Sequence, residues 1–333
     1  MNNYSNRPAA PRVGVVGATG YAGCELLNRL ARHPGVELVA AMSSGRGEAP
    51  AVAELAAAYH GRTGLVCTPA SVAAMREARA DFVFLCTPPE ISTEWVEGLR
   101  AAGAGPRVID LSGAYRFRDD VVYGWPEKNS EAVRTAALVS NPGCYATAAL
   151  TAIWPLAAAG AIDPEAVICD AKSGVSGAGK GLRADLLYAE LDGNCKAYNV
   201  FKHRHAPEIA RHAALGEAGA ASFIFTPHLL PTSRGILATT YVKLQPGVGE
   251  NEIATAYARV FTAASAPFVR IRGARLPEIK DVVHTNFCDL GWSVRGRQAV
   301  VVTTLDNLVK GAAGQALENF NLMTGWPRET ALL

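Results

Sequence analysis

The sequence has no long uninterrupted apolar run and no concentration of charge of one sign. No window holds the ~18 consecutive apolar residues of a membrane-spanning helix, and the first twelve residues lack the apolar core of a secretory signal. No block of like charges occurs, and the formal net charge is +2. This argues against nucleic acid or a membrane as a partner and leaves small anions open. The expected location is the cytoplasm.

Cysteine is used in a way that excludes a disulfide framework. The seven cysteines are an odd number, none forms a C-x-x-C pair, and they are spread along the chain, so we expect reduced thiols. His203 and His205 alternate as metal ligands on a strand would, but no group of carboxylates or cysteines with ligand spacing completes such a site. We therefore expect no metal, and we find no internal repeat or low-complexity segment.

The chain does contain enough apolar residues for a large core. Its 333 residues are 49% hydrophobic and 19% charged, which predicts a globular protein of two domains. Short apolar runs near the N-terminus lack polar alternation, and helical patterns separate them, as in a parallel sheet covered on both faces. This predicts a Rossmann-type doubly wound α/β domain with strands in 12–18, 36–43, 81–88, 107–112 and 137–142 and helices in 21–33, 50–59, 71–78 and 90–102.

The pattern changes after Cys144, where neighbouring apolar runs are joined by short turns. These runs predict an α+β second domain with a largely antiparallel sheet, including strands at 268–273, 282–289, 292–295 and 299–304. The last helical pattern begins at Asn307 and is expected to return to the first domain. The expected division is an NADP-binding domain at 1–143 and 307–333 and a catalytic, substrate-binding and oligomerisation domain at 144–306.

The segment GATGYAG links the first predicted strand to the first predicted helix and carries Gly17, Gly20 and Gly23. Glycine permits a tight turn and close approach of phosphate oxygens, and the free amides at a helix start attract negative charge. The alternative is an ordinary tight turn, but the position after a strand near the N-terminus favours dinucleotide binding. We assign this segment, including Thr19 and Tyr21, to the cofactor site.

The end of the second predicted strand bears on the choice between NAD and NADP. An NAD site usually has an acidic residue there that holds the ribose hydroxyls. This chain instead has Ser43, Ser44 and Arg46, with no carboxylate just before them. Hydroxyls and a guanidinium suit the additional phosphate of NADP. A solvated loop is the alternative, and NADP(H) is the expected cofactor.

Cys144 follows Asn-Pro-Gly and precedes a run rich in alanine and leucine. Pro142 and Gly143 break the preceding strand, so the run predicts a helix with the thiol in its first turn. There the unpaired amides and the positive end of the helix dipole lower the pKa of a thiol from its usual ~8.5 and make it a nucleophile at neutral pH. Taken alone, a cysteine at a helix start is more often structural.

A second cluster changes that balance. Lys202, His203, Arg204 and His205 are consecutive and precede a Pro-Glu pair that opens a predicted helix. Burying two histidines and two cations without partners costs several kcal/mol, which disfavours a core position. The cluster is either a solvated basic turn or an anion-binding site with a proton donor, since histidine titrates near neutral pH.

Three further segments offer polar groups for an anionic substrate. Ser112 and Arg116 follow a predicted strand where open α/β sheets present ligands, and Arg234 lies in TSRGI. Either guanidinium can fork onto a carboxylate or a phosphate. Lys172 and Lys180 flank SGVSGAG, whose glycines favour an anion-contacting loop over a core strand. For each of these cations, a surface or interdomain ion pair is an equally good interpretation.

Six motifs occur in order along nearly the whole chain: GATGYAG, SNPGCYAT, KSGVSGAGK, HRHAPEI, PHLLPTSRGI and DNLVKGAAGQA. Together they closely resemble the N-acetyl-γ-glutamyl-phosphate reductases, the arginine-pathway relatives of aspartate-semialdehyde dehydrogenase. Many dehydrogenases share the glycine turn, whereas the cysteine and HRHAPEI motifs are far more specific. The resemblance implies a two-domain enzyme that reduces an acyl phosphate to an aldehyde with NADPH, releases phosphate, and forms homodimers or homotetramers.

The resemblance also implies roles for individual residues. Cys144 corresponds to the nucleophile, which forms a thioester, and His205, two places before Pro-Glu, corresponds to the acid/base. Lys180 ends a motif in which arginine is common, although a point charge can also hold phosphate. The remaining assignments are Thr87, Pro88, Ser173, Gly174, Asn307, Gly311 and Ala312 to the cofactor, and Ser112, Arg116, Asn141, Lys180, His203, Arg204 and Arg234 to the substrate.

Two other functions stay open at this point. A dehydrogenase of the same architecture could act on aspartyl phosphate or on an aminoadipyl analogue carried by a protein. A non-catalytic NADP-binding sensor would use Cys144 only as a structural or redox-sensitive thiol. Phosphate-dependent reduction of NADP with N-acetylglutamate semialdehyde, compared with aspartate semialdehyde, distinguishes these functions.

Overall fold

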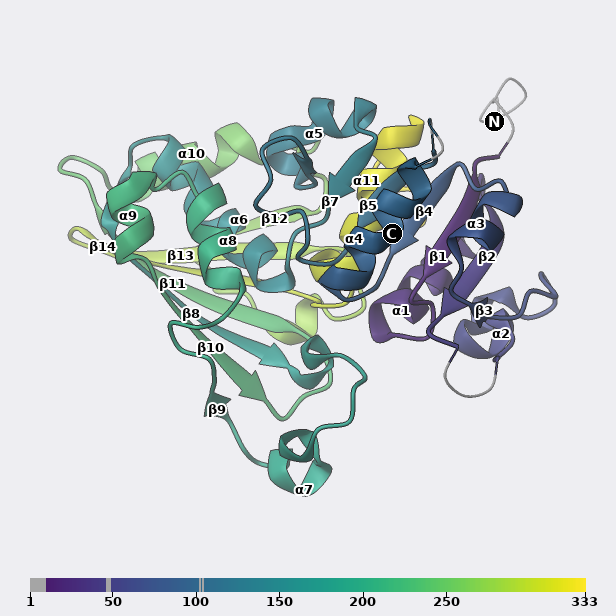
Figure 1. The fold of residues 1–333 in the computed structure, drawn as a ribbon. Coiled ribbons are helices and arrows are strands. Elements are labelled where there is room, and N and C mark those ends of the chain that lie inside the picture. Colours follow the sequence, from purple (N-terminus) through teal and green to yellow (C-terminus); the bar gives the residue numbers. More distant parts are fainter. Residues whose placement is uncertain (1–9, 46–48, 102, 104) are drawn as a thin grey trace. The chain divides into compact units, whose positions relative to one another are not determined.

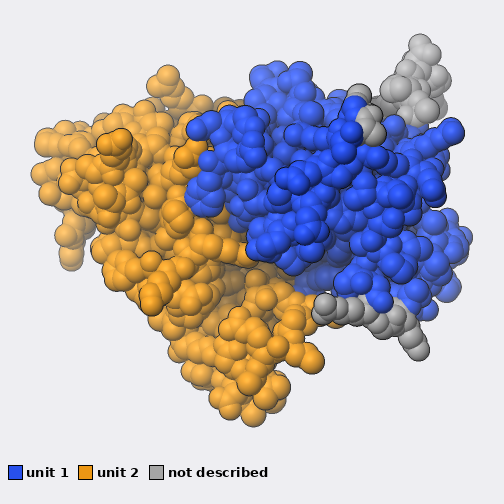
Figure 2. Space-filling model, viewed as in Figure 1, with its two compact units in different colours: residues 1–124, 131–141, 316–333 blue, residues 125–130, 142–315 orange. Residues whose placement is uncertain are grey.

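The computed structural model describes residues 10–45, 49–101, 103 and 105–333 (Figure 1). They form two compact units, each with its own seven-stranded sheet. The first unit comprises 1–124, 131–141 and 316–333, and the second comprises 125–130 and 142–315, as Figure 2 shows. In the part of the chain that is described, no helix is both long enough and apolar enough to cross a membrane.

Every strand pairing in the sheet of the first unit is parallel, and the order is β3-β2-β1-β4-β5-β7-β6. The central strands are buried along most of their length, as a parallel sheet covered on both faces requires. The predicted Rossmann-type doubly wound fold is therefore confirmed. Its strands are β1 (Arg12–Val16), β2 (Glu37–Ser43), β3 (Thr68–Pro69), β4 (Phe82–Leu85), β5 (Arg107–Asp110), β6 (Val122–Tyr123) and β7 (Leu138–Ser140).

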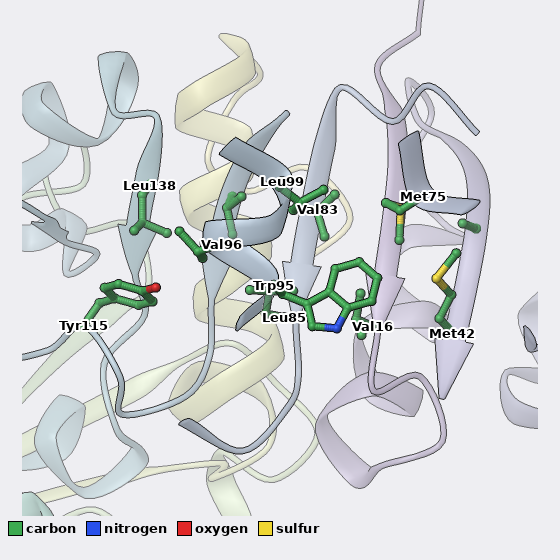
Figure 3. Close-up of a cluster of buried hydrophobic side chains, with 12 residues drawn as sticks. Val16, Met42, Met75, Val83, Leu85, Trp95, Val96, Leu99, Tyr115 and Leu138 are labelled. Carbon is green, nitrogen blue, oxygen red and sulfur yellow. The ribbon is translucent and has the colours of Figure 1, made fainter. Parts of the chain in front are cut away.

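A cluster of buried apolar side chains fixes helices to this sheet (Figure 3). Met75 from α3 and Trp95 from α4 belong to one cluster with Val16 and Leu85 of the central strands. The expected helix at 50–59 is interrupted, because Ala56 has an extended backbone (φ −142°, ψ 98°). The helices are α1 (Tyr21–Leu30), α2 (Val52–Leu55), the 3-10 helix η1 (Ala57–Tyr59), α3 (Val72–Glu77) and α4 (Pro89–Arg100).

The second unit is built on a mixed sheet in the order β12-β13-β14-β11-β8-β10-β9. Four of its pairings are antiparallel, whereas β10 with β8 and β12 with β13 are parallel. The expectation of a largely antiparallel sheet is confirmed in its centre. The strands are β8 (Ile162–Gly174), β9 (Lys196–Ala197), β10 (Ile224–Leu230), β11 (Ile236–Leu244), β12 (Val269–Gly273), β13 (Cys288–Arg295) and β14 (Gln298–Leu305).

Two local expectations for this unit are wrong. Residues 282–287 are not a strand, and β13 instead runs unbroken from Cys288 to Arg295. Within that turn, the N–H of His284 donates to the Asp306 carboxylate at 2.7 Å instead of joining a sheet. Lys172 does not lie in a loop, because β8 continues through it and pairs it with His228 and Leu237.

Helix α6 (Cys144–Ala158) lies at the centre of the second unit's core. It packs against β8, β11, β13 and β14, and against α8 (His205–His212) and α10 (Glu250–Val260). Tyr257 of α10 donates from its hydroxyl to the carbonyl of Ala152 at 2.7 Å. Most of the helix is therefore buried and held from several sides. The remaining helices are η2 (Val175–Ala178), η3 (Ala184–Leu186), α7 (Tyr188–Leu191), α9 (Gly216–Ser222), η4 (Ile279–Asp281) and the π-helix η5 (Val309–Ala313).

The two units divide at positions that differ from the expected domain boundaries. Helix α5 (Pro126–Thr135) is kinked at Asn129, and 125–130 belongs to the second unit. There Trp125 meets Trp154 edge-on, with ring centroids 5.6 Å apart. Residues 307–315 also stay with the second unit, so the chain returns to the first unit within α11 (Gly314–Thr324) and not at Asn307.

Candidate active site

Cys144 is the first residue of α6, and no side chain caps the start of that helix. The N-cap is Gly143, with φ −70° and ψ 150°, and it has no side chain that could accept a bond from the first-turn amides. The predicted helix start is confirmed. These amides and the positive end of the α6 dipole favour the thiolate form of Cys144.

The other thiols of the second unit lie in different surroundings. Cys169 and Cys288 are fully buried, and burial raises the pKa of each to about 12. Both are therefore protonated and unreactive at neutral pH. Cys195 is exposed and lies in none of the elements that surround Cys144. Among the thiols of the second unit, Cys144 alone combines partial exposure with a helix start.

Glu208 holds the turn that precedes Cys144. Its carboxylate Oε1 accepts the N–H of Gly143 at 2.8 Å, and both groups are buried. Because Glu208 lies one turn after His205 on α8, this bond joins the histidine-bearing helix to the start of α6. Sequence reasoning missed Glu208, since an acidic residue in the first turn of a helix is already explained by the helix dipole.

His203 and His205 lie together, but His205 is buried whereas His203 is partly exposed. The N–H of His205 donates to Nδ1 of His203 at 3.1 Å, and the two rings are 4.9 Å apart. Burial, with a smaller effect of Arg204, lowers the pKa of His203 to about 4, so this ring is neutral at pH 7 with its proton on Nε2. The ring of Tyr145 lies edge-on to both histidines, at 5.5 Å from His203 and 5.9 Å from His205.

A pocket of about 360 Å³ in the second unit brings many of these side chains together. Its wall contains both expected catalytic residues, Cys144 and His205. Four further residues assigned from the sequence also line it, namely Ser173, Gly174, His203 and Arg204. Lys202 of the candidate anion-binding cluster lines it as well, and the polar or aromatic pocket residues that sequence reasoning missed are Tyr145, Arg183, Asp185, Lys196, Tyr198 and Asn199.

Two residues of the second unit that are assigned to the substrate do not line this pocket. Lys180 is exposed in the turn after η2. Arg234 lies with its Nη1 atom 3.5 Å from the fully buried carboxylate of Asp306. That carboxylate also accepts the N–H groups of Leu308 and Val309. The guanidinium of Arg234 therefore balances a buried charge that shapes the segment after β14.

The three C-terminal residues assigned to the cofactor belong to the second unit, in or next to the π-helix η5. Asn307 is buried; its Oδ1 accepts the N–H of Gly235 at 2.8 Å, and its Nδ2 donates to Ser176 at 2.9 Å. Gly311 lies against the nucleophile, because a Cβ atom added there would be 2.7 Å from the Cβ of Cys144. Ala312 follows it in the same turn.

The glycine turn of the first unit needs two of its glycines for steric reasons. Gly17 has φ +80°, and a Cβ there would overlap the carbonyl of Cys86. A Cβ on Gly23 would overlap the carbonyl of Gly17. Gly20 is the N-cap of α1 and offers no side chain to its amides. The turn, with Thr19 and Tyr21 in it, therefore leaves the start of α1 open to an anion.

The other cofactor assignments in the first unit lie at the carboxyl ends of β2 and β4, which flank β1 in the sheet. Ser43 ends β2, and Ser44 follows it as an exposed residue. Arg46 lies outside the described residues. Thr87 bonds the Ser92 hydroxyl at 2.8 Å, and Pro88 is the N-cap of α4.

Ser112, Arg116 and Asn141 come together at the ends of β5 and β7. The hydroxyl of Ser112 donates to Asp110 at 2.7 Å, and burial raises the pKa of the Asp110 carboxyl. Arg116 donates from Nε to the carbonyl of Asn141 and from Nη2 to that of Leu111, both at 3.0 Å. Because all three assigned side chains are buried, they hold the chain as it approaches Cys144.

Two family models match the chain. The semialdehyde dehydrogenase NAD binding domain matches residues 12–136, and the semialdehyde dehydrogenase dimerisation domain matches residues 144–307. An N-acetyl-gamma-glutamyl-phosphate reductase from Symbiobacterium thermophilum is 41% identical and one from Pelotomaculum thermopropionicum is 40% identical. Each alignment covers 97% of this chain, and 97% and 98% of those proteins respectively.

The chain belongs to the N-acetyl-γ-glutamyl-phosphate reductase family. Solved structures agree on the fold. An aspartate semialdehyde dehydrogenase II from Vibrio cholerae has a TM-score of 0.73 at 17% identity, covering 96% of this chain and 99% of that one. The Candida albicans enzyme solved with NADP has the same TM-score at 14% identity, covering 95% and 98%.

Membership of this family implies a nicotinamide cofactor, and the first unit has residues that fit one. The glycine turn leaves space where side chains would overlap the backbone, and the start of α1 is uncapped. The end of β2 provides the hydroxyls of Ser43 and Ser44, and no carboxylate directly precedes them in the sequence. These features match a pyrophosphate at a helix start and the additional phosphate of NADP.

Proposed function

We propose that this enzyme reduces N-acetyl-γ-glutamyl phosphate to N-acetylglutamate 5-semialdehyde with NADPH and releases phosphate, a step of arginine biosynthesis. The observation that carries the proposal is the pocket in which Cys144, at the uncapped start of α6, lies with His205. The names and the near-complete coverage of the relatives support the substrate.

Cys144 is the nucleophile in this proposal. Its thiolate attacks the acyl carbon, a C–S bond forms, and the bond from that carbon to the phosphate oxygen breaks, so that phosphate leaves and a thioester remains. The first-turn amides of α6 then stabilise negative charge that develops on the carbonyl oxygen. Holding the acyl group covalently makes the reduction an effectively unimolecular step.

His205 moves the proton. When bound, NADPH supplies the hydride that reduces the thioester carbonyl. His205 donates a proton to the resulting oxyanion and takes it back as the C–S bond breaks, which releases the aldehyde and restores the thiolate. His203 is less suited to this role, because its Nδ1 already accepts a backbone N–H and its pKa is lowered to about 4.

The two units divide the work in this proposal. The first unit binds NADP through the glycine turn and the ends of β2 and β4, and the second unit carries the nucleophile, the substrate pocket and the contacts between subunits. Arg204 contacts anionic groups of the substrate from the pocket wall. Ser112, Arg116 and Asn141 contribute to substrate binding chiefly by fixing the chain before Cys144.

We also propose a homodimer formed through the outer face of the mixed sheet. Ile168 and Tyr241 are paired neighbours on β8 and β11, and they are 41% and 44% exposed on the face opposite α6. Exposed large apolar side chains on a sheet face favour a partner surface, and the family model matched here is named for dimerisation. Light scattering should show a dimer that Tyr241→Glu dissociates; a tetramer would require a further surface.

We place the enzyme in the cytoplasm, where its seven cysteines would stay reduced.

The experiment that tests the activity measures phosphate-dependent NADP reduction with N-acetylglutamate semialdehyde. Wild-type enzyme should turn over this substrate far faster than aspartate semialdehyde. Cys144→Ser should fold and bind NADPH but lose activity by orders of magnitude. Cys195→Ser, which changes an exposed cysteine outside the pocket, is the matched control. Near-normal turnover by Cys144→Ser would refute the thioester route, and NADP binding without turnover of any semialdehyde would refute the reductase.

A further inference from the structure

The pocket around Cys144 has an excess of positive charge that the chemistry at Cys144 does not explain. Four cations line it, Arg183, Lys196, Lys202 and Arg204, against a single carboxylate, Asp185. All five residues belong to the stretch between β8 and α8. This stretch therefore decides which charges a bound substrate meets.

The single carboxylate is already occupied by one cation. Arg183 forks onto Asp185, with Nε 3.0 Å from Oδ1 and Nη2 2.7 Å from Oδ2. Lys196 lies farther away, with Nζ 3.5 Å from Oδ2 and 3.2 Å from the Asp185 carbonyl. A bidentate fork satisfies a carboxylate better than a single contact at 3.5 Å, so much of the charge of Lys196 is left for another anion.

Lys202 and Arg204 have no carboxylate partner among the described residues. Both are exposed and line the pocket beside His203 and His205. Lys196 is held in place by the sheet, because β9 pairs with β10 and sets Lys196 opposite Leu229. Lys196, Lys202 and Arg204 thus line the same pocket and together make up its cation wall. The strand β9 fixes Lys196, and the segment that leads into α8 carries the other two.

We propose that Lys196, Lys202 and Arg204 select acyl phosphates whose α-amine is acylated and reject those that carry a free ammonium group. This inference rests on the proposed function. An amino-acid acyl phosphate carries a carboxylate, a phosphate and an ammonium, and acetylation removes only the positive charge. The anionic groups are then attracted whether or not the amine is acylated, whereas the ammonium is repelled by the wall.

The size of the effect follows from Coulomb's law. A unit charge ~7 Å away at an effective dielectric constant of ~20 changes binding by roughly 50-fold, and screening by physiological salt over that distance reduces the change to roughly tenfold. Removing two cations of the wall should therefore change the preference between acetylated and free-amine substrates by roughly 30- to 100-fold. Screening by salt should reduce the preference of the wild-type enzyme in the same way.

The test compares two substrates that differ only at the amine, aspartate semialdehyde and its N-acetyl derivative, in the phosphate-dependent direction. Wild-type enzyme should prefer the acetylated compound in kcat/KM. Lys196→Met/Lys202→Met should reduce that preference at least tenfold, mainly through KM, and 0.5 M salt should reduce it in the wild type. Lys196→Arg/Lys202→Arg should restore the preference, because it restores the charges.

Arg259→Met removes an exposed cation of the same unit on α10, outside the pocket, and should leave the preference unchanged. Thermal melting and NADP titration check that the double variant is folded. A preference that is unaltered in the double variant overturns the inference, as does an equal loss for both substrates, which would mean that the lysines hold only the shared phosphate. If the wild-type enzyme does not turn over N-acetylglutamate semialdehyde, the proposed function itself is refuted. That result differs from a wild-type enzyme that is active but whose substrate preference does not depend on the lysines.

Discussion

Gly311→Ala tests how tightly the segment after β14 controls the nucleophile. A Cβ at this position would be 2.7 Å from the Cβ of Cys144, 3.2 Å from its Cα and 3.2 Å from Cδ1 of Leu305. Ordinary carbon contacts begin near 3.4 Å, so one side must move by about 0.7 Å. The π-helix that contains Gly311 resists such movement, since Gly311 donates its N–H to the Asp306 carbonyl at 2.9 Å.

The shift should reduce turnover more than it reduces stability. Displacing a reacting group by ~1 Å lowers a rate about 100-fold, so we expect kcat to fall roughly 10- to 100-fold. Overpacking a buried contact destabilises by about 1–3 kcal/mol, which thermal melting should detect. Alkylation of Cys144 by iodoacetamide, measured against pH, reports on the thiol independently of the substrate.

Gly249→Ala is the matched control. A Cβ there would meet only a carboxylate oxygen of Glu252 at 3.5 Å, and the residue lies at the N-cap of α10. It should leave kcat and alkylation unchanged. If Gly311→Ala melts at a lower temperature but keeps turnover within twofold of the wild type, then the π-helix yields instead of Cys144, and the reasoning is refuted.

Three further variants test the supports of the site. Glu208→Ala leaves the buried N–H of Gly143 without its acceptor and should destabilise by about 1–3 kcal/mol and lower kcat, whereas Glu208→Gln should recover much of both. Lys310→Met leaves the buried Glu127 carboxylate without the ammonium group that lies 2.8 Å from it. Urea unfolding should show that the free energy of unfolding falls by about 3–5 kcal/mol, and by less when Glu127→Leu is made in the same chain. The lowered pKa of His203, about 4 against 6.5, means that stability from this group is complete above pH 6.5 and falls as the pH drops toward 4. His203→Asn should therefore flatten that decline, and an equally steep decline in the variant would contradict the assigned cause.

The sequence predicted the first unit better than the second, for a physical reason. Parallel strands such as β1 and β4 are buried on both faces, so each is a short apolar run that stands out from the helices around it. Strands β8, β10 and β11 of the mixed sheet mix polar and apolar residues, and β8 and β10 also contain proline. Their pairing depends on partners far along the chain, which local pattern does not reveal.

The residues of the site also divide into those that a local motif predicted and those that only the fold revealed. Cys144 and His205 were found because each lies in a distinctive local motif, and both line one pocket. Lys196 was missed, since its role depends on the pairing of β9 with β10. Glu208 was missed because its acceptor role becomes visible only when α8 packs on α6. Local sequence therefore indicated the reacting groups, while the groups that position them required the fold.

Gly311 shows why this distinction matters for the cofactor. The sequence assigns it to the NADP site by resemblance, whereas the structure places it against Cys144 within the second unit. The two roles separate in one experiment on Gly311→Ala. A contact with the cofactor predicts a weaker NADP Kd with unchanged alkylation of Cys144. A steric role predicts slower turnover and altered alkylation, with the NADP Kd unchanged, because the glycine turn that binds the pyrophosphate is untouched. A changed Kd with normal alkylation would return Gly311 to the cofactor site.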